Sequence, residues 1–376
     1  MTMKRQLEEL TQLGVSVWLD DLDRRRLESG NLAELIAEWG VRGVTTNPSI
    51  FESALRNAPE TYAEQLRGCA EDGLGVEQAV GAVTCDDVRA ACDLFLPLWH
   101  SSAGTDGRVS IEVDPRLAHQ APATVAQARD LWNQVDRANA MIKIPATRAG
   151  LQAIAEVIGQ GISVNVTLIF SPDRYREVLA AYARGLHAAS VGGLDLASIH
   201  SVASVFVSRV DTAVDARLDG LGTPAAQALR GRAGVTNAQR IWGAYREFLA
   251  SDVWARLSSI GARPQRPLWA STGVKDPALP DTWYVTELVG PGCVNTMPEA
   301  TLRAVADHGH LSGARLTDAQ TLQDAQQVWH ELAELGLDAD ALFTTLEDNG
   351  VAAFEASWER LLDAARAVMS GRHATP

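Results

Sequence analysis

The sequence predicts an α/β protein that folds as a single (β/α)8 barrel with additional helices. Short runs rich in β-branched residues alternate with segments that carry helical spacing of apolar residues, which favours a parallel sheet. There are eight such runs, the number of strands that closes this kind of barrel. No Pro/Gly/Ser-rich linker divides the 376 residues. We therefore expect one domain over 1–370 and a disordered tail over 371–376.

The expected strands follow the β-branched runs in chain order. They cover 15–20, 43–47, 108–114, 140–145, 163–170, 199–207, 266–272 and 283–288. Helices are expected over 31–39, 122–136, 148–158 and 172–187, with helix starts at Asn31 and at Ser171-Pro172. Residues 51–105, 211–262 and 299–370 carry further helical material. We interpret it as helices that decorate the barrel; the alternative is a separate C-terminal domain.

Composition narrows the classes of function. A formal net charge of -14 argues against a broad surface for nucleic acid or for an anionic membrane. The four cysteines show no metal-like spacing, as expected for a reduced intracellular protein. The first residues, MTMKRQLEELTQLG, indicate a polar amphipathic helix rather than a signal peptide. No apolar run approaches the roughly 20 residues of a membrane span. We expect a soluble, cytoplasmic protein.

Polar residues occupy one face of several expected strands. Strand residues alternate between the helix layer and the barrel interior. In 163–170, Val164, Val166 and Leu168 are expected to face the helices, and Asn165 and Thr167 the interior. The same alternation in the other strands places Ser110, Met141 and several strongly polar residues inside the barrel. Most of the polar residues lie near the carboxyl ends of the strands, where barrel enzymes have their active sites. This interior set is Asp20, Glu112, Lys143, Asn165 and Thr167.

A lysine beside two carboxylates suits amine catalysis at a carbonyl group. The 33 basic residues include only three lysines, Lys4, Lys143 and Lys275, and therefore 30 arginines. Of the two residue types, lysine is the one that can lose its proton and become a nucleophile. Two carboxylates could then serve as acid and base. The alternative is a structural hydrogen-bonded network. Burial of several charges is costly, which favours an active site. Motifs for dinucleotides, P-loops and HExxH metal sites are absent from the sequence.

Six segments resemble transaldolases. They are GVTTNPSIF, SIEVDPRLA, MIKIPAT, NVTLIFS, SVFVSRVD and VNTMPEATL, the last expected to follow the eighth strand. The resemblance extends from VWLDDL to LEDNGVAAFEASWERLL and so covers nearly the whole chain. In length, the chain is similar to the longer bacterial members of that family. The resemblance implies a TIM barrel and a Schiff-base mechanism.

The resemblance also implies roles for single residues. Lys143 would form the Schiff base, and Asp20 would handle the proton of the substrate's C4 hydroxyl. Glu112 would act through a water held by Asn165 and Thr167. Further residues of the implied substrate-binding set are Asn47 and Ser204 for the dihydroxyacetone part, Arg209 and Ser271 for the phosphate, and in addition Ser110 and Phe206.

The segment ASTGVKDP departs from the commoner family pattern ASFR. Gly273 stands in the place of the phosphate-binding arginine. Gly273 is expected to let the backbone turn toward the anion. Lys275, four residues after Ser271, is then a candidate contact for the phosphate; the alternative is a solvated surface lysine.

The implied reaction transfers a dihydroxyacetone unit from sedoheptulose 7-phosphate to glyceraldehyde 3-phosphate. The products would be erythrose 4-phosphate and fructose 6-phosphate. No metal or organic cofactor is implied, and the protein would be a monomer or a homodimer. The nearest alternative is a fructose 6-phosphate aldolase, a relative that carries tyrosine where this chain has Phe206. A non-catalytic barrel that binds sugar phosphates is a further alternative.

Overall fold

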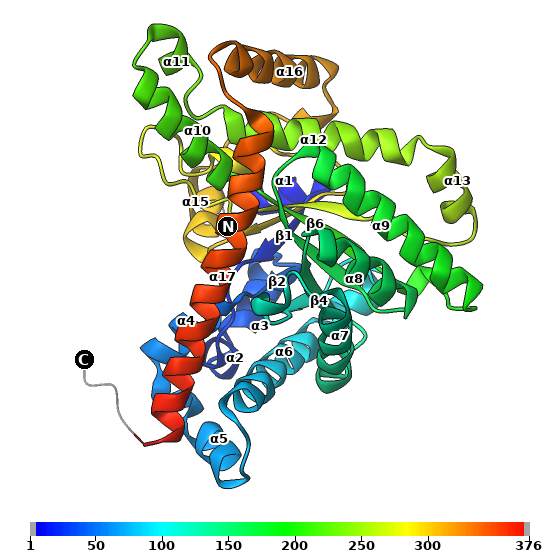
Figure 1. Cartoon of the computed structure of the whole chain (residues 1–376), viewed down its shortest axis with the longest axis vertical. Helices are drawn as coiled ribbons and strands as arrows, with labels where there is room; N and C mark the ends of the chain where they lie inside the picture. Colours follow the sequence, from blue (N-terminus) through cyan, green and yellow to red (C-terminus); the bar gives the residue numbers. More distant parts are fainter. Residues whose placement is uncertain (1–4, 372–376) are drawn as a thin grey trace.

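The protein forms a closed barrel of eight parallel strands in the order β1 to β8 (Figure 1). The computed structural model describes residues 5–371, so the ends 1–4 and 372–376, with nearly all of the expected tail, lie outside the described residues. The predicted (β/α)8 barrel is confirmed. Its strands are β1 (Ser16–Leu19), β2 (Gly43–Thr45), β3 (Arg108–Glu112), β4 (Ala140–Pro145), β5 (Val164–Ile169), β6 (Ser201–Phe206), β7 (Arg266–Ala270) and β8 (Val294–Met297).

Helices surround the barrel, and extra ones lie at its ends (Figure 1). Ser171 begins α9 as expected, because its side chain accepts a hydrogen bond from the Arg174 N–H and Pro172 follows at the first helical position. The helices are α1 (Arg5–Gln12), α2 (Arg24–Glu28), α3 (Asn31–Trp39), α4 (Pro48–Asn57), α5 (Pro59–Glu71), α6 (Val76–Ser101), α7 (Ala121–Val135), α8 (Arg148–Gly159), α9 (Pro172–Val191), α10 (Ser208–Leu221), α11 (Pro224–Ala228), α12 (Ala233–Leu249), α13 (Asp252–Ser259), α14 (Trp283–Thr286), α15 (Glu299–His308), α16 (Ala319–Glu334) and α17 (Ala339–Met369), with short 3-10 turns η1 (Pro115–Leu117), η2 (Leu196–Ser198) and η3 (Arg315–Thr317).

The eighth strand is not where the sequence predicts it. Residues 283–288 contain α14, and β8 lies farther along the chain, inside the segment VNTMPEATL. Periodicity alone does not separate a short apolar strand from a short helix. Pairing decides here, because β8 bonds to both β1 and β7 and so closes the barrel. Tyr284 anchors α14 to α10, because its hydroxyl donates a hydrogen bond to Asp211 at 2.8 Å.

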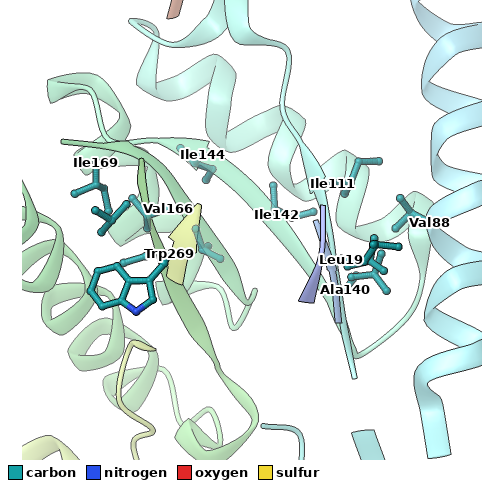
Figure 2. Packing of buried hydrophobic residues seen from close by; sticks show 14 of the residues in the cluster. Leu19, Val88, Ile111, Ala140, Ile142, Ile144, Val166, Ile169 and Trp269 are labelled. Atoms are coloured by element: carbon teal, nitrogen blue, oxygen red, sulfur yellow. The ribbon is translucent and has the colours of Figure 1, made fainter. Parts of the chain in front are cut away.

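Outward side chains of the strands pack against the helices. Ile111, Ile142 and Val166 belong to this large apolar layer, and Figure 2 shows them with Val88 of α6. A second apolar cluster lies partly in the barrel interior, with Trp18, Met141 and Leu268 among its members, and extends to α10, α16 and α17. The alternation predicted for the strands therefore holds for most of the barrel.

Strand β5 breaks the predicted alternation at Leu168. Its pairing with β6 shifts register between Val166 and Ile169, and Leu168 has φ 58°. The inserted residue reverses the phase of the strand. Leu168 therefore packs in the inner cluster, contrary to the expectation that it faces the helices, and Ile169 takes the outer place.

The long helix α17 crosses the barrel and packs against α4, α5, α6, α10 and β5 (Figure 1). Ion pairs hold it at several points: Glu347 to Arg174 of α9 at 3.2 Å, and Arg360 to Glu52 of α4 at 2.8 Å. This helix thus reaches elements that follow β2, β5 and β6, at the carboxyl end of the barrel. Among the helices of residues 5–371, none has both the length and the apolar character needed to cross a membrane.

Candidate active site

A small pocket opens where the strands end. It has a volume of about 110 Å³ and receives side chains from the ends of β1, β2, β4, β6 and β7 and from α17. Barrel enzymes carry out catalysis at this end. Its lining residues are Asp20, Thr45, Asn47, Ser49, Lys143, Ser204, Phe206, Arg209, Ala270, Ser271, Thr296 and Phe354.

Lys143 is the buried cation of this pocket. Only 6% of its side chain is exposed. The Nζ atom donates a hydrogen bond to the Thr46 carbonyl oxygen at 2.6 Å and lies 3.4 Å from Glu112 Oε2. The strand register explains this arrangement, because Lys143 pairs with Glu112 on β3 and with Asn165 on β5. The three side chains therefore share one layer of the barrel interior.

Two carboxyl groups lie near Lys143: Asp20, which is partly buried, and Glu112, whose side chain is 5% exposed. Burial raises the pKa of Asp20, while the charge of Lys143 and a hydrogen bond from Thr45 oppose this rise. Burial likewise raises the pKa of Glu112, against the charge of Lys143 and hydrogen bonds from Lys143 and Thr167. A carboxyl group whose pKa is raised can hold or release a proton nearer neutral pH. The site thus joins one amine to two acid/base candidates.

A hydrogen-bonded layer supports these groups. Thr167 donates to Glu112 Oε1 at 3.5 Å, and Asn165 Nδ2 donates to Ser110 Oγ at 3.0 Å. The Ser204 hydroxyl donates to Asn165 Oδ1 at 2.7 Å. Ser110, expected to bind substrate, is fully buried and bonded to Asn165. Ser110 can therefore affect substrate binding only indirectly, by holding the Asn165 side chain.

Asn47 occupies the end of β2 and also begins α4. Its Oδ1 atom accepts hydrogen bonds from the backbone N–H groups of Ser49 at 3.0 Å and Ile50 at 3.2 Å. The helix cap fixes the side chain and engages its oxygen. The amide NH2 is thus the part of Asn47 that can serve a ligand.

Arg209 and Ser271 lie on the β6–β7 side of the pocket. The guanidinium carbon of Arg209 lies 4.9 Å from the ring centre of Phe206. Burial lowers the pKa of Arg209, with Glu112 opposing this effect. Ser271 has φ 56°, and its hydroxyl lies 2.9 Å from that of Ser208. The Arg209 guanidinium and the Ser271 hydroxyl, which the buried Ser208 hydroxyl supports, can therefore contact an anion together.

The loop after β7 differs from the sequence expectation. The left-handed turn falls on Ser271, not on Gly273, whose φ lies outside that region. Lys275 is exposed, is not among the pocket's lining residues, and forms no ion pair within 4 Å with any residue between 5 and 371. The structure therefore does not bring Lys275 together with the other candidate residues.

Five lining residues were not anticipated from the sequence: Thr45, Ser49, Ala270, Thr296 and Phe354. The hydroxyl of Thr45 donates to Asp20 Oδ1 at 2.7 Å and lies 2.6 Å from that of Thr296. Thr45 lies within GVTTNPSIF and Thr296 within VNTMPEATL, so the motifs contained a signal for both. Phe354 comes from α17, and only the tertiary structure shows that this helix reaches the pocket.

Comparison with known proteins agrees with the barrel and its motifs. Residues 17–365 match the family model described as Transaldolase/Fructose-6-phosphate aldolase. A transaldolase of Mycolicibacterium smegmatis is 56% identical over 97% of each chain. A transaldolase of Parafrankia sp. is 54% identical, over 97% of this chain and 98% of its own. The protein named transaldolase 1 of Streptomyces avermitilis is 56% identical, over 98% of this chain and 97% of its own. The chain therefore belongs to the transaldolase/fructose-6-phosphate aldolase family.

Proposed function

We propose that this protein is a transaldolase. It transfers a dihydroxyacetone unit from sedoheptulose 7-phosphate to glyceraldehyde 3-phosphate and so makes erythrose 4-phosphate and fructose 6-phosphate. The observation that carries the proposal is the buried Lys143 amine, which shares one pocket with Asp20 and lies 3.4 Å from Glu112. The relatives named transaldolase cover nearly the full chain, which supports the same reaction.

The first half of the reaction forms a covalent bond to the enzyme. The neutral amine of Lys143 attacks the ketone carbon of the donor and gives a carbinolamine. Its hydroxyl group must leave as water. Glu112 accepts the ammonium proton of Lys143, which leaves the amine neutral for attack, and then donates this proton to the departing hydroxyl through a water held by Thr167 and Asn165. The product is an iminium ion, which withdraws electrons from the neighbouring carbon–carbon bond.

The second half breaks and remakes that bond. Asp20 takes the proton of the C4 hydroxyl, the C3–C4 bond cleaves, and its electron pair flows to the iminium nitrogen. The aldehyde leaves, and an enamine stays on Lys143. Attack of the enamine on the acceptor aldehyde reverses these movements, and Asp20 returns its proton to the new hydroxyl. Water then adds to the new iminium carbon in the reverse of the Glu112-assisted dehydration, which frees fructose 6-phosphate and the Lys143 amine. Burial favours the role of Asp20, because it raises the pKa of this residue and makes its carboxylate a better base.

The remaining pocket residues bind the substrate. Asn47 and Ser204 contact the dihydroxyacetone part, and Ser110 supports Ser204 through Asn165. Arg209 and Ser271 bind the phosphate. We retain Lys275 as an additional phosphate contact, which requires its loop to fold toward the pocket when substrate binds.

Cleavage without transfer, as in a fructose 6-phosphate aldolase, is the second candidate. A tyrosine at position 206 would offer a phenol to protonate the enamine and release dihydroxyacetone. Phe206 lines the pocket and has no proton to give. This difference favours transfer over release.

We also propose a cytoplasmic monomer or homodimer with one domain over 1–370. The four cysteines are all free and buried, as is usual in reducing compartments. The ion pairs from α17 to α9 and to α4 support a single domain.

Two measurements test the proposal. A steady-state assay with both sugar phosphates should show transfer, and omission of the acceptor should leave little release of dihydroxyacetone. Borohydride added with fructose 6-phosphate should label Lys143, and Lys143→Arg should abolish both activity and label, because a guanidinium group stays protonated. A label on Lys4 or Lys275, or no label with the active wild-type enzyme, would refute the mechanism.

A further inference from the structure

Arg209 lies in the pocket without an acidic partner close by. Its guanidinium forms no ion pair within 4 Å with any of the residues that the structure describes. Two aromatic rings hold it instead: Phe206, three residues earlier in the chain, at 4.9 Å, and Phe354 at 5.8 Å from ring centre to guanidinium carbon. A cation near the faces of such rings is attracted by their electrons.

Phe354 is the remote member of this arrangement. It comes from the middle of α17, is 6% exposed, and its ring centre lies 6.3 Å from that of Phe206. Phe206 belongs to β6 and Arg209 to the first turn of α10, so both come from one short segment. Helix α17 therefore adds a wall that the barrel itself does not provide.

Close packing of α17 fixes this wall. Gly350 lies one turn before Phe354, and a Cβ atom there would lie 2.9 Å from Leu168 and 3.6 Å from an Arg209 guanidinium nitrogen. The absence of a side chain lets the helix approach the pocket. The ion pair of Glu347 with Arg174 holds the helix on the same side. The ring of Phe354 thus has a fixed place.

We propose that Phe354 is a positioning residue that holds the Arg209 guanidinium toward a phosphate group of the substrate. The inference rests on the proposed function for the identity of the substrate. A ring attracts the cation but uses none of its N–H donors, whereas a carboxylate would occupy two of them. No carboxylate of the described residues lies within ion-pair distance of Arg209, and Glu112 acts on its charge only from farther away. Both properties leave the guanidinium ready for an anion.

The test replaces the ring and keeps an apolar side chain. Phe354→Leu should weaken binding of inorganic phosphate, measured by calorimetry, by roughly 3- to 30-fold, the equivalent of a lost cation–π contact. The KM for glyceraldehyde 3-phosphate should rise by a similar factor, while the KM for unphosphorylated glyceraldehyde should stay near the wild-type value. Phe354→Tyr, which keeps an aromatic face, should retain phosphate binding.

A matched control separates this role from general packing. Phe343 lies on the same helix, and its ring packs against Trp329 at 5.3 Å between centres. Phe343→Leu should leave phosphate binding unchanged. In an Arg209→Ala background, Phe354→Leu should have no further effect on phosphate affinity.

Three outcomes would overturn the inference. They are equal losses for phosphorylated and unphosphorylated acceptors, an undiminished effect of Phe354→Leu without Arg209, and no phosphate binding by the wild-type protein. Calorimetry does not require catalysis. A protein that binds phosphate through Arg209 and Phe354 but transfers no dihydroxyacetone would refute the proposed function and keep this inference.

Discussion

Replacement of Lys143 by methionine should make the stability of the protein depend more strongly on pH. The positive charge of Lys143 opposes the effect of burial on the pKa of Asp20 and of Glu112. Methionine fills much of the same volume but carries no charge. Both carboxyl pKa values should therefore rise farther in the folded variant than in the folded wild-type protein.

The direction of the effect follows from proton binding. A carboxyl group with a folded pKa above its unfolded value binds its proton more tightly when folded. The resulting stabilisation is complete below the unfolded pKa, about 4 for these groups, and is lost as pH rises through the folded pKa. In Lys143→Met this loss should extend to higher pH. The free energy of unfolding of the variant should thus be closest to that of the wild-type protein in mild acid.

The size of the effect follows from the contacts. Loss of one partner from a buried ion pair costs about 3–5 kcal/mol when the other charge stays. The lost hydrogen bond to the Thr46 carbonyl adds about 1 kcal/mol, independent of pH. We therefore expect the free energy of unfolding to fall by about 4–6 kcal/mol at pH 8 and by about 1–2 kcal/mol near pH 5, where the carboxyl groups can take up protons.

Urea unfolding of both proteins at several pH values measures this difference. The double variant Lys143→Met/Glu112→Gln provides the control, because it removes the carboxylate that Lys143 pairs with. It should be more stable than Lys143→Met at pH 8 and should show a weaker pH dependence. If Lys143→Met loses the same stability at pH 5 as at pH 8, the reasoning from buried charge is wrong.

Four further predictions concern turnover and phosphate binding. Asp20→Asn should lower kcat by roughly 10²–10⁴-fold yet still allow borohydride trapping on Lys143; near-normal kcat would exclude Asp20 as the base. Phe206→Tyr should increase the ratio of free dihydroxyacetone to transfer product in a donor-only assay, and an unchanged ratio would assign the fate of the enamine to other groups. A Cβ atom at Gly273 would meet only Pro298, at 3.6 Å, and Thr301, at 3.9 Å, so Gly273→Arg should fit and lower the KM for phosphorylated substrates. Lys275→Ala should raise that KM more than the KM for an unphosphorylated analogue, and equal effects would make Lys275 a surface residue.

Local sequence patterns were sufficient to predict much of the candidate site. Glu112, Lys143 and Asn165 stand on the polar phase of three successive strands, and neighbouring parallel strands place such residues side by side. Alternation is a property of each extended backbone, so it can be read without knowledge of the rest of the chain. The barrel class followed in the same way from eight strands separated by helices.

Contacts between distant segments decided what the sequence left open. The residues of β8 form a strand because they pair with β1 and β7. Residues 283–288 have no strand partner and contain helix α14. Leu168 turns inward because β5 bulges against β6. Phe354 lies beside Arg209 because α17 crosses the mouth of the barrel. Strand pairing, bulges and helix docking depend on partners remote in the sequence, and no local period encodes those partners.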